Sequence, residues 1–307
     1  MRTVFMGNPE FAIPSLRAIK NSRCNLVAVV SNPPKPFGRK RLIQLTPVGQ
    51  YAKDHSILFI EANSVKSEDL KIKLSKLKPD IFVVVAYKIL PSSLINIPRY
   101  GSINLHASLL PKYRGAAPIQ WSLMNGDKET GITVFQIKPS VDTGDIIAQK
   151  KIKISDQDNM LTLSRRLSIL GSDLVLDAMK KIEQGDKGIP QNTNHATKAP
   201  KIGKEMIIIN WSWTARKIHN WIRGLTPKPG MSTYINGKRI RVYKTKVLNS
   251  DYGKPGAIVN VNKDNIIVST SEGSLSLLEI QLEGKKKLPV NDFLKGYDIK
   301  LGTVLGR

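Results

Sequence analysis

Short apolar runs alternate with amphipathic stretches over the first third of the chain. The run at residues 81–86 is continuously apolar and rich in Val, which is typical of a strand buried on both faces of a parallel sheet. Asn8 followed by Pro9 predicts the start of a helix that extends to Lys20, and residues 67–78 have amphipathic helical spacing. The expected strands are residues 3–6, 26–31, 56–60, 81–86 and 102–105. This alternation predicts an α/β fold with a doubly wound, mostly parallel, Rossmann-like sheet.

The second half of the chain changes from helical to strand periodicity. Leucines recur at helical spacing through residues 159–184, which predicts one long helix with an apolar face. A polar stretch follows, and we expect it to be a linker in which His195 is solvated. Ser212 is placed to cap a short helix that reaches Ile222.

Hairpin signals dominate the C-terminal part. Asn236 and Gly237 separate two strand-like runs, and residues 262–265 separate two runs rich in Val and Ile. Short antiparallel strands at this spacing predict a small β-barrel related to the oligonucleotide-binding (OB) fold. The expected domains are residues 1–187 with the parallel sheet, a linker at 188–206, and the barrel at 207–307.

Size and charge narrow the class of protein. A chain of 307 residues is long enough for two cores. Lys and Arg number 48 against 24 Asp and Glu, and the resulting net charge of +24 favours a polyanionic partner such as nucleic acid. A generally lysine-rich composition would give part of this charge without such a partner. The single cysteine, Cys24, excludes an internal disulfide, and with four His a structural zinc site is not expected.

Membrane spans, leader segments and dinucleotide sites are not expected either. The apolar run at residues 81–87 is too short to cross a bilayer, and the first strand follows Met1 too closely for a leader. We therefore expect a cytoplasmic protein, and we take it to be monomeric. The first strand-to-helix turn has one glycine, Gly7, where the dinucleotide fingerprint has three, and the second strand ends at Ser31 without an acidic residue. These differences argue against an NAD-dependent oxidoreductase.

Three polar residues are candidates for catalysis. Asn104 and His106 are two apart at the end of an expected strand, so their side chains share one side of it. An Asn amide can donate to an oxyanion, a His can carry a proton, and the carboxylate of Asp142 can hold that His in one tautomer. Each residue also has a structural interpretation: a turn contact for Asn104, a core hydrogen bond for His106 and an Asx-turn for Asp142.

The segment around these residues resembles the formyltransferases that use 10-formyltetrahydrofolate. The matching positions are Asn104, His106, residues 108–111, Gly115, Pro118, and Asp142 with Thr143, Gly144 and Asp145. Residues 4–12, 31–41, 80–87, 210–212 and 222–225 extend the resemblance along the chain, to the methionyl-tRNA formyltransferase branch. The resemblance implies formyl transfer from 10-formyltetrahydrofolate to the α-amino group of methionyl-initiator tRNA. It also implies Asn104, His106 and Asp142 as catalytic residues, with no metal.

The same resemblance implies two sets of binding residues. The folate-binding set is Val85, Ala86, Tyr87, Ser108, Leu109, Leu110, Pro111 and Gly115. The tRNA-binding set is Arg39, Lys40, Arg41, Lys238, Arg239 and Arg241. The first three tRNA-binding residues lie in a segment bounded by Pro and Gly that we expect to lack regular structure, and the family's loop of this type enters the acceptor end of tRNA. A basic strand face can follow phosphates, although a solvated surface is the alternative.

Three positions depart from the family's pattern. The segment at Lys88 and Ile89 is shorter than usual, which bears on the folate pocket. Lys228 stands where Trp is common, and Lys40 stands where Gly is common. Formyltransferases that act on an amino-sugar nucleotide or on glycinamide ribonucleotide would share the three catalytic residues and remain alternatives. A non-catalytic RNA-binding protein would keep the basic strands but would not need the three catalytic residues together.

Overall fold

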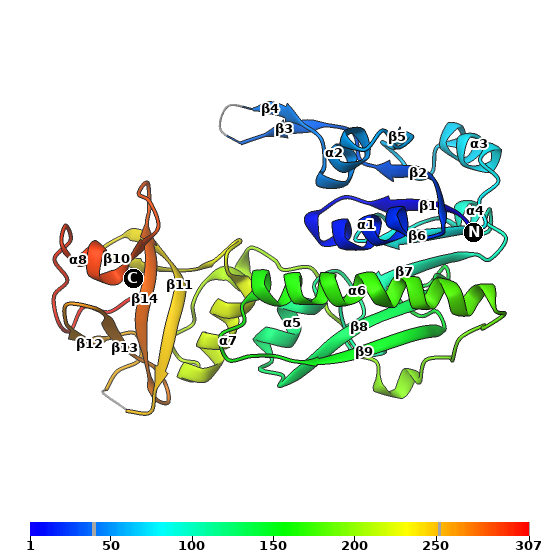
Figure 1. Ribbon diagram of the computed structural model, residues 1–307. Coiled ribbons are helices and arrows are strands. Elements are labelled where there is room, and N and C mark those ends of the chain that lie inside the picture. Colours follow the sequence, from blue (N-terminus) through cyan, green and yellow to red (C-terminus); the bar gives the residue numbers. More distant parts are fainter. Residues whose placement is uncertain (39–40, 251–252, 307) are drawn as a thin grey trace. The chain divides into compact units, whose positions relative to one another are not determined.

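The computed structural model describes residues 1–38, 41–250 and 253–306. Tertiary contacts divide the chain into two compact units, whose elements are labelled in Figure 1. The first unit comprises Met1–Pro118, Glu129–Lys153 and Ser164–Pro200, and the second comprises Ile119–Lys128, Ile154–Leu163 and Lys201–Arg307. The chain therefore passes between the units repeatedly, because two short internal segments belong with the C-terminal part.

The first unit is built on a seven-stranded sheet with the order β5-β2-β1-β6-β7-β8-β9. The strands from β5 to β7 are parallel, whereas β8 and β9 are antiparallel to their neighbours. These strands are β1 (Arg2–Gly7), β2 (Asn25–Ser31), β5 (Phe59–Glu61), β6 (Ile81–Val85), β7 (Ser102–His106), β8 (Glu129–Gln136) and β9 (Ile146–Lys153). Every residue of β6 is buried, as expected for a strand covered on both faces. The prediction of a mostly parallel, Rossmann-like sheet is confirmed.

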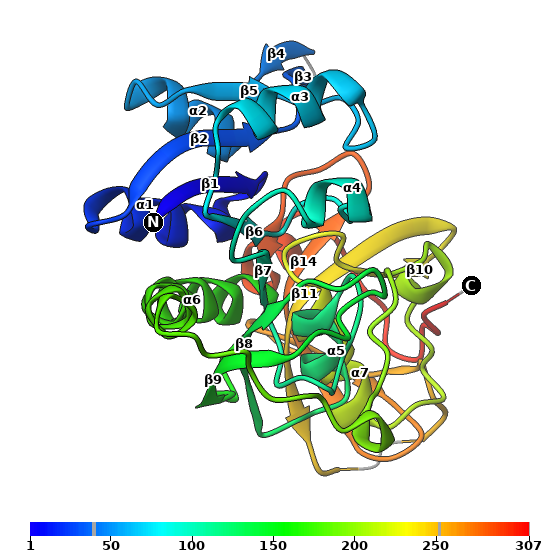
Figure 2. The ribbon, with the colours of Figure 1, turned by 90° about the vertical axis from the view of Figure 1, so that its right-hand side faces the viewer.

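Helices pack against this sheet. They are α1 (Ile13–Asn21), α2 (Pro47–Asp54), α3 (Glu68–Lys76), α4 (Ser92–Ile95) and, from Ser164 onward, α6 (Met160–Glu183). Figure 2 shows α6 almost end-on beside β7 and β8. A Cβ atom on Gly171 would lie 2.6 Å from Leu105 Cδ2 and 2.8 Å from Ile132 Cδ1. The glycine thus lets α6 approach the end of the sheet that carries His106.

The expected start of the first helix is wrong. A 3-10 turn at Glu10–Ala12 precedes α1, and Asn8 does not cap it. Instead, Asn8 Oδ1 accepts hydrogen bonds from Ser31 Oγ at 2.9 Å and from the Asn32 amide at 3.0 Å. Because β1 and β2 are adjacent parallel strands, the Asn8 side chain connects their carboxyl ends.

Two short strands that the sequence did not predict lie on either side of the segment expected to be irregular. Strands β3 (Lys35–Phe37) and β4 (Leu42–Gln44) are antiparallel, with Lys35 opposite Gln44. Leu42 and Ile43 are 60% and 68% exposed, so their burial contributes little to holding the pair. The prediction missed the hairpin because each strand has only three residues, too few to show a strand pattern. Arg39 and Lys40 lie outside the described residues.

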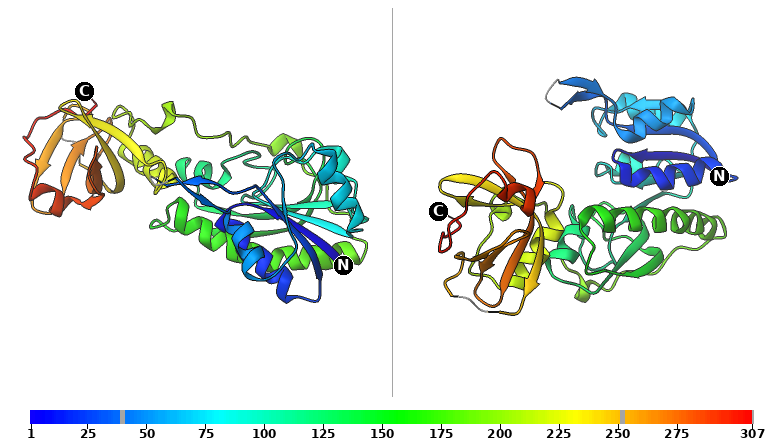
Figure 3. Two further views of the ribbon diagram at one scale, coloured as in Figure 1. Left: turned by 90° about the horizontal axis from the view of Figure 1, so that it is seen from above. Right: turned by 60° about the vertical axis from the view of Figure 1, so that its left-hand side comes forward.

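The second unit contains a six-stranded antiparallel sheet, visible from two directions in Figure 3. Its order is β10-β11-β14-β13-β12, and β15 pairs with β14. The strands are β10 (Met231–Ile235), β11 (Lys238–Leu248), β12 (Ile258–Val261), β13 (Ile266–Ser269), β14 (Ser274–Leu282) and β15 (Leu288–Pro289). Asn236 and Gly237 have φ angles of 48° and 73°, so the first predicted hairpin turn is confirmed.

The helices of the second unit include α5 (Pro118–Met124, from Ile119 onward), α7 (Ala215–Leu225) and α8 (Val290–Leu294). The expected cap of α7 is wrong, because Thr214 accepts the Lys217 amide at 3.3 Å and Ser212 lies ahead of the helix. A Cβ on Gly224 would lie 2.7 Å from Met124 Cγ. This close packing joins α7 to α5 within one apolar core. Among the residues that the structure describes, no helix combines the length and the apolar character needed to span a membrane.

Candidate active site

His106 is buried at the carboxyl end of β7, in the first unit. Its Nε2 atom lies 2.9 Å from the main-chain carbonyl oxygen of Tyr113. A carbonyl oxygen can only accept, so Nε2 carries a hydrogen whether the ring is neutral or charged. The proton on Nδ1 is therefore the one that the ring can gain or lose.

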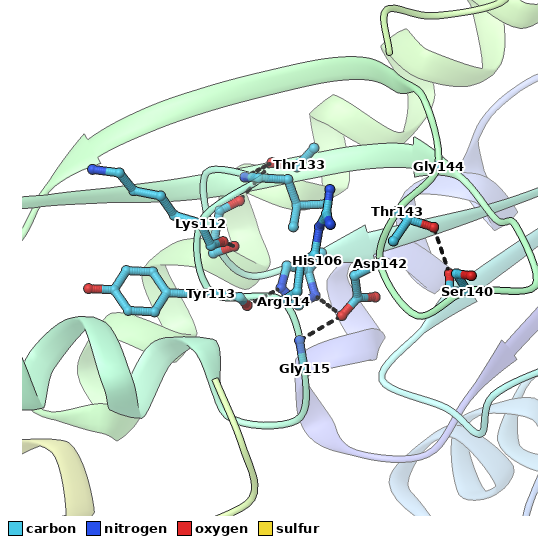
Figure 4. Close-up of polar contacts among 12 residues, drawn as sticks. His106, Lys112, Tyr113, Arg114, Gly115, Thr133, Ser140, Asp142, Thr143 and Gly144 are labelled. Carbon is cyan, nitrogen blue, oxygen red and sulfur yellow. Dashed lines mark hydrogen bonds and ion pairs between the residues drawn. The ribbon is translucent and has the colours of Figure 1, made fainter. Parts of the chain in front are cut away.

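Asp142 faces this nitrogen from the connection between β8 and β9. Its Oδ2 atom lies 3.7 Å from His106 Nδ1, and it accepts a hydrogen bond from the Gly115 amide at 2.8 Å (Figure 4). The side chains of His106 and Asp142 are only 6% and 12% exposed, which weakens the screening of their interaction by water. Asp142 has a φ of 54°, an unusual value for a residue with a Cβ.

Asn104 lies two residues before His106 on β7, opposite Val84 of β6 and Phe135 of β8. It is half-buried, and its side chain makes no hydrogen bond to the part of the chain that the structure describes. Two residues along a strand return to the same side. The amide of Asn104 is therefore free to donate a hydrogen bond on the same side of β7 as His106.

The loop after β7 is held by side chains that sequence reasoning missed. Thr133 Oγ1 donates to the Ser108 carbonyl at 2.7 Å and accepts the Leu110 amide at 3.2 Å. Gln149 Nε2 donates both to Thr133 Oγ1 and to the Leu110 carbonyl. Thr133 on β8 and Gln149 on β9 lie directly opposite each other in the β8–β9 hairpin, which the sequence prediction did not include. The hairpin thus holds the main chain of the predicted folate-binding segment.

The loop continues to Gly115, where the main chain approaches the segment before the second unit. A Cβ on Gly115 would lie 2.6 Å from the Ala199 carbonyl oxygen, and the residue has a φ of 126°. The Tyr113 amide donates to Thr197 Oγ1 at 2.8 Å, and the Ala199 amide donates to the Arg114 carbonyl at 2.7 Å. The segment expected to be a linker therefore pairs with the site loop, while His195 is exposed as predicted.

The other predicted folate-binding residues lie at the neighbouring strand end. Val85 pairs with Leu105, so Ala86 and Tyr87 leave β6 beside the end of β7. Burial raises the pKa of the Tyr87 phenol to about 12, and its buried Oη has no hydrogen-bond partner among the described residues. In the shortened segment, Lys88 Nζ donates to the carbonyls of Ala62 and Asn63 at 2.9 and 2.7 Å. This ties the segment to the loop after β5.

The described tRNA-binding candidates belong to two units. Arg41 is exposed in the first unit, immediately before β4. Lys238 is exposed at the start of β11, and the half-buried Arg239 pairs with Glu283 at 3.4 Å. Arg241 is also half-buried on β11. Lys228, one of the family departures, is exposed.

A metal centre finds no support in the side chains of the described ranges, where no group of three or more His, Cys, Asp or Glu is suitably placed. The second unit has a half-buried titratable residue, His219. His219 Nδ1 lies 2.8 Å from Thr245 Oγ1. Burial, followed by the positive charges of Arg223 and Arg216, lowers the pKa of His219 to about 4. The ring is therefore neutral in the folded protein at neutral pH.

Comparison with known proteins identifies the family. The formyl transferase family matches residues 1–179, and the formyl transferase C-terminal domain matches residues 201–298. The N-formyltransferase of Helicobacter canadensis, solved with folinic acid and dTDP-3-aminofucose, has a TM-score of 0.68 at 22% identity. That match covers 90% of this chain and 98% of the other, and it shows a shared fold.

Relatives in sequence extend over both units. The methionyl-tRNA formyltransferase of Caldanaerobacter subterraneus subsp. tengcongensis is 42% identical, covering 99% of this chain and 100% of that protein. The methionyl-tRNA formyltransferase of Syntrophomonas wolfei subsp. wolfei is also 42% identical, covering 100% of this chain and 99% of that protein. With this identity maintained from end to end, the chain belongs to the methionyl-tRNA formyltransferase family.

Proposed function

We propose that the protein transfers the formyl group of 10-formyltetrahydrofolate to the α-amino group of methionine on initiator tRNA. The observation that carries the chemistry is the contact of Asp142 with both His106 and the Gly115 amide at the end of a parallel strand. The choice of acceptor is supported by full-length similarity to proteins with that name. An enzyme with this acceptor acts in the cytoplasm, and we expect it to work as a monomer.

Asn104 and His106 are assigned to the oxygen of the reacting formyl group. The amine attacks as a neutral base, and a free α-amine has a pKa of roughly 7.7–8.0, so a useful fraction is neutral in the cell. Attack on the formyl carbon forms a tetrahedral intermediate with a negative oxygen. The Asn104 amide donates to this oxygen, where a well-placed donor stabilises the transition state more than the ground state.

His106 and Asp142 are assigned to proton transfer. The amine loses one proton as the new C–N bond forms, and N10 of the donor gains one as its bond to the formyl carbon breaks. Nδ1 is the exchangeable nitrogen of His106, because Nε2 is bonded to the Tyr113 carbonyl. The Asp142 carboxylate at 3.7 Å stabilises the charged ring between these two events.

The residues at the ends of β6 and β7 fit a folate. The unpartnered Tyr87 Oη can donate to a polar atom of the ligand, since the phenol stays protonated below a pKa of about 12. We assign Val85, Ala86 and Tyr87 to one side of the binding site for the formyl donor. We assign the main chain from Ser108 to Pro111, with Gly115, to the other side of that site.

We assign tRNA binding to basic residues of both parts of the chain. Arg39 and Lys40, which lie outside the described residues, and the exposed Arg41 would place the aminoacyl end at the catalytic domain, residues 1–187. Lys238, Arg239 and Arg241 would bind phosphates through the C-terminal domain, residues 207–307 after a linker at 188–206. The net charge of +24 supports this assignment, because it attracts a polyanion.

Formylation of methionyl-initiator tRNA by the purified protein with 10-formyltetrahydrofolate tests the proposal, with methionyl-elongator tRNA as the comparison. We expect transfer to the initiator species alone. Transfer to neither tRNA, with the folate still bound, would refute the acceptor. Amino-sugar nucleotides and glycinamide ribonucleotide would then be the next acceptors to assay.

A further inference from the structure

Gln191 joins the two loops that meet at the candidate active site. Its Oε1 accepts from Arg114 Nε at 3.1 Å and from Arg114 Nη2 at 2.7 Å. Its Nε2 donates to the carbonyls of Asp142 at 3.0 Å and Gly144 at 2.8 Å. All four residues belong to the first unit. One side chain therefore links the loop after β7 to the connection between β8 and β9.

The orientation of this amide is determined by its partners. An Arg guanidinium can only donate, and a carbonyl oxygen can only accept. Exchanging the oxygen and nitrogen of Gln191 would turn all four hydrogen bonds into repulsive contacts. The amide uses both of its hydrogens and both of its lone pairs, so it is a rigid connection between the loops.

These bonds hold both ends of the contact between Asp142 and Gly115. The Asp142 carbonyl that Gln191 binds belongs to the residue whose φ is 54°, a conformation that persists only where the surroundings impose it. The carboxylate of the same residue contacts His106 and the Gly115 amide. Arg114 immediately precedes Gly115 in the chain, so Gln191 restrains that end as well.

We propose that Gln191 is a positioning residue, which holds the Asp142 carboxylate against His106 during formyl transfer. This inference rests on the proposed function for its catalytic consequence. Gln191 itself touches neither reacting group; it acts through the main chain of Asp142. The residue after it, Asn192, has an exposed side chain that accepts the Asn194 amide of its own turn. Contact with the site is thus a property of Gln191 rather than of the whole segment.

Gln191→Glu keeps the hydrogen bonds to Arg114 and removes those to the Asp142 and Gly144 carbonyls. The carboxylate can still accept from Arg114, but it has no hydrogens for the Asp142 and Gly144 carbonyls and repels them. We expect kcat to fall by about 10- to 100-fold, as small misplacements of catalytic groups do, with the KM for the formyl donor changed less than about threefold. Gln184→Glu is the matched control, because Gln184 is exposed and the charge change is the same.

Amide hydrogen exchange supplies a readout that does not depend on activity. The Gly115 N–H is bonded to Asp142 Oδ2, so its exchange should become at least about tenfold faster in Gln191→Glu and stay unchanged in Gln184→Glu. Gln191→Met, which removes all four bonds without adding charge, should give the same loss of protection if the Glu variant does not fold.

The outcomes distinguish this inference from the proposed function. Faster exchange at Gly115 together with a selective fall in kcat would support the positioning role. Unchanged exchange in a folded variant, or a rise in KM with normal kcat, would overturn it. If the wild-type protein transfers no formyl group to either tRNA, the proposed function fails. The exchange comparison would then still decide whether Gln191 holds Asp142 in place.

Discussion

At the scale of single residues, two main-chain groups determine the geometry of the site. The Tyr113 carbonyl binds His106 Nε2, and the Gly115 amide binds the Asp142 carboxylate. His106 Nδ1 and Asp142 Oδ2 therefore lie 3.7 Å apart, which is too long for a direct hydrogen bond. The tautomer of the ring is set by the loop that follows it, and Asp142 contributes mainly its charge.

Asn104→Ala should lower kcat by roughly 10²–10³, because it removes a donor to the developing oxyanion. Asn104→Asp should be no better, since a carboxylate accepts and cannot donate. Steady-state formylation kinetics measure both effects, and Asn96→Ala is a control at an exposed asparagine. Near-normal turnover in a correctly folded Asn104→Ala protein would rule out the oxyanion role.

His219 should make stability depend on pH in the acidic range. Its pKa is about 4 when folded and about 6.5 when unfolded, so the unfolded chain binds more protons between these values. The free energy of unfolding should therefore fall as pH decreases from 6.5 toward 4, by about 2 kcal/mol after allowing for partial exposure of the ring.

Chemical denaturation across this pH range measures the effect. His219→Asn, which keeps an acceptor near Thr245, should lose less stability on acidification than the wild type does. His195→Asn, at an exposed histidine, should leave the slope unchanged. Equal slopes for the wild type and His219→Asn would show that another group is responsible.

At the scale of elements, the connection between β8 and β9 brings Asp142 to the end of β7. This connection returns tightly on itself, because the Gln136 amide donates to the Asp145 carbonyl at 2.9 Å. Gly144 lies within it, and any Cβ at this position would overlap the Gln136 carbonyl oxygen. Glycine follows Thr143 here because the main chain passes too close for a side chain.

Gly144→Ala should destabilise the protein by about 2–3 kcal/mol, since the main chain must move to relieve the overlap. Turnover should fall as well, because the movement displaces Asp142. Denaturation and kinetics on the same preparation measure both. Gly296→Ala is the control, because a Cβ atom at Gly296 would meet no other atom within 4 Å. Stability within about 0.5 kcal/mol of wild type would contradict this interpretation of the turn.

At the scale of the whole molecule, the net charge of +24 accompanies two separately packed units. A net charge of this size attracts any polyanion, whereas selectivity for one nucleic acid requires contacts at particular positions. We propose the hairpin of β3 and β4 as one such place, because Arg41, Leu42 and Ile43 are exposed there.

Arg39→Ala should weaken formylation of methionyl-tRNA with little loss of folate binding. If Arg39 neutralises a phosphate, the slope of log binding constant against log salt should decrease by about one. Binding titrations at several salt concentrations measure the slope, and Arg17→Ala on α1 is a control for the loss of one charge. Unchanged tRNA kinetics and an unchanged slope would remove Arg39 from the interface.

The sequence predicted a helix, strand or turn correctly wherever a local pattern of residues specified it. The Val-rich run of β6, the leucine spacing of α6 and the turn at Asn236 and Gly237 each form as predicted. Local capping preference failed at Asn8 and Ser212. The Asn8 side chain bonds to Ser31 instead of capping a helix, and Thr214 caps α7 in place of Ser212. It also missed the β3–β4 and β8–β9 hairpins, in which each strand pairs with its neighbour.

By itself, the sequence determined the α/β class of the first unit, the antiparallel strands of the second, and Asn104, His106 and Asp142 as the residues of interest. Only the tertiary structure decided how the last two meet: the turn that carries Asp142, the Tyr113 carbonyl, and Gln191 from a segment expected to be a linker. The physical reason is that periodicity reports which face of an element is buried. Contacts between loops distant in the chain depend on main-chain atoms, whose positions no local pattern specifies.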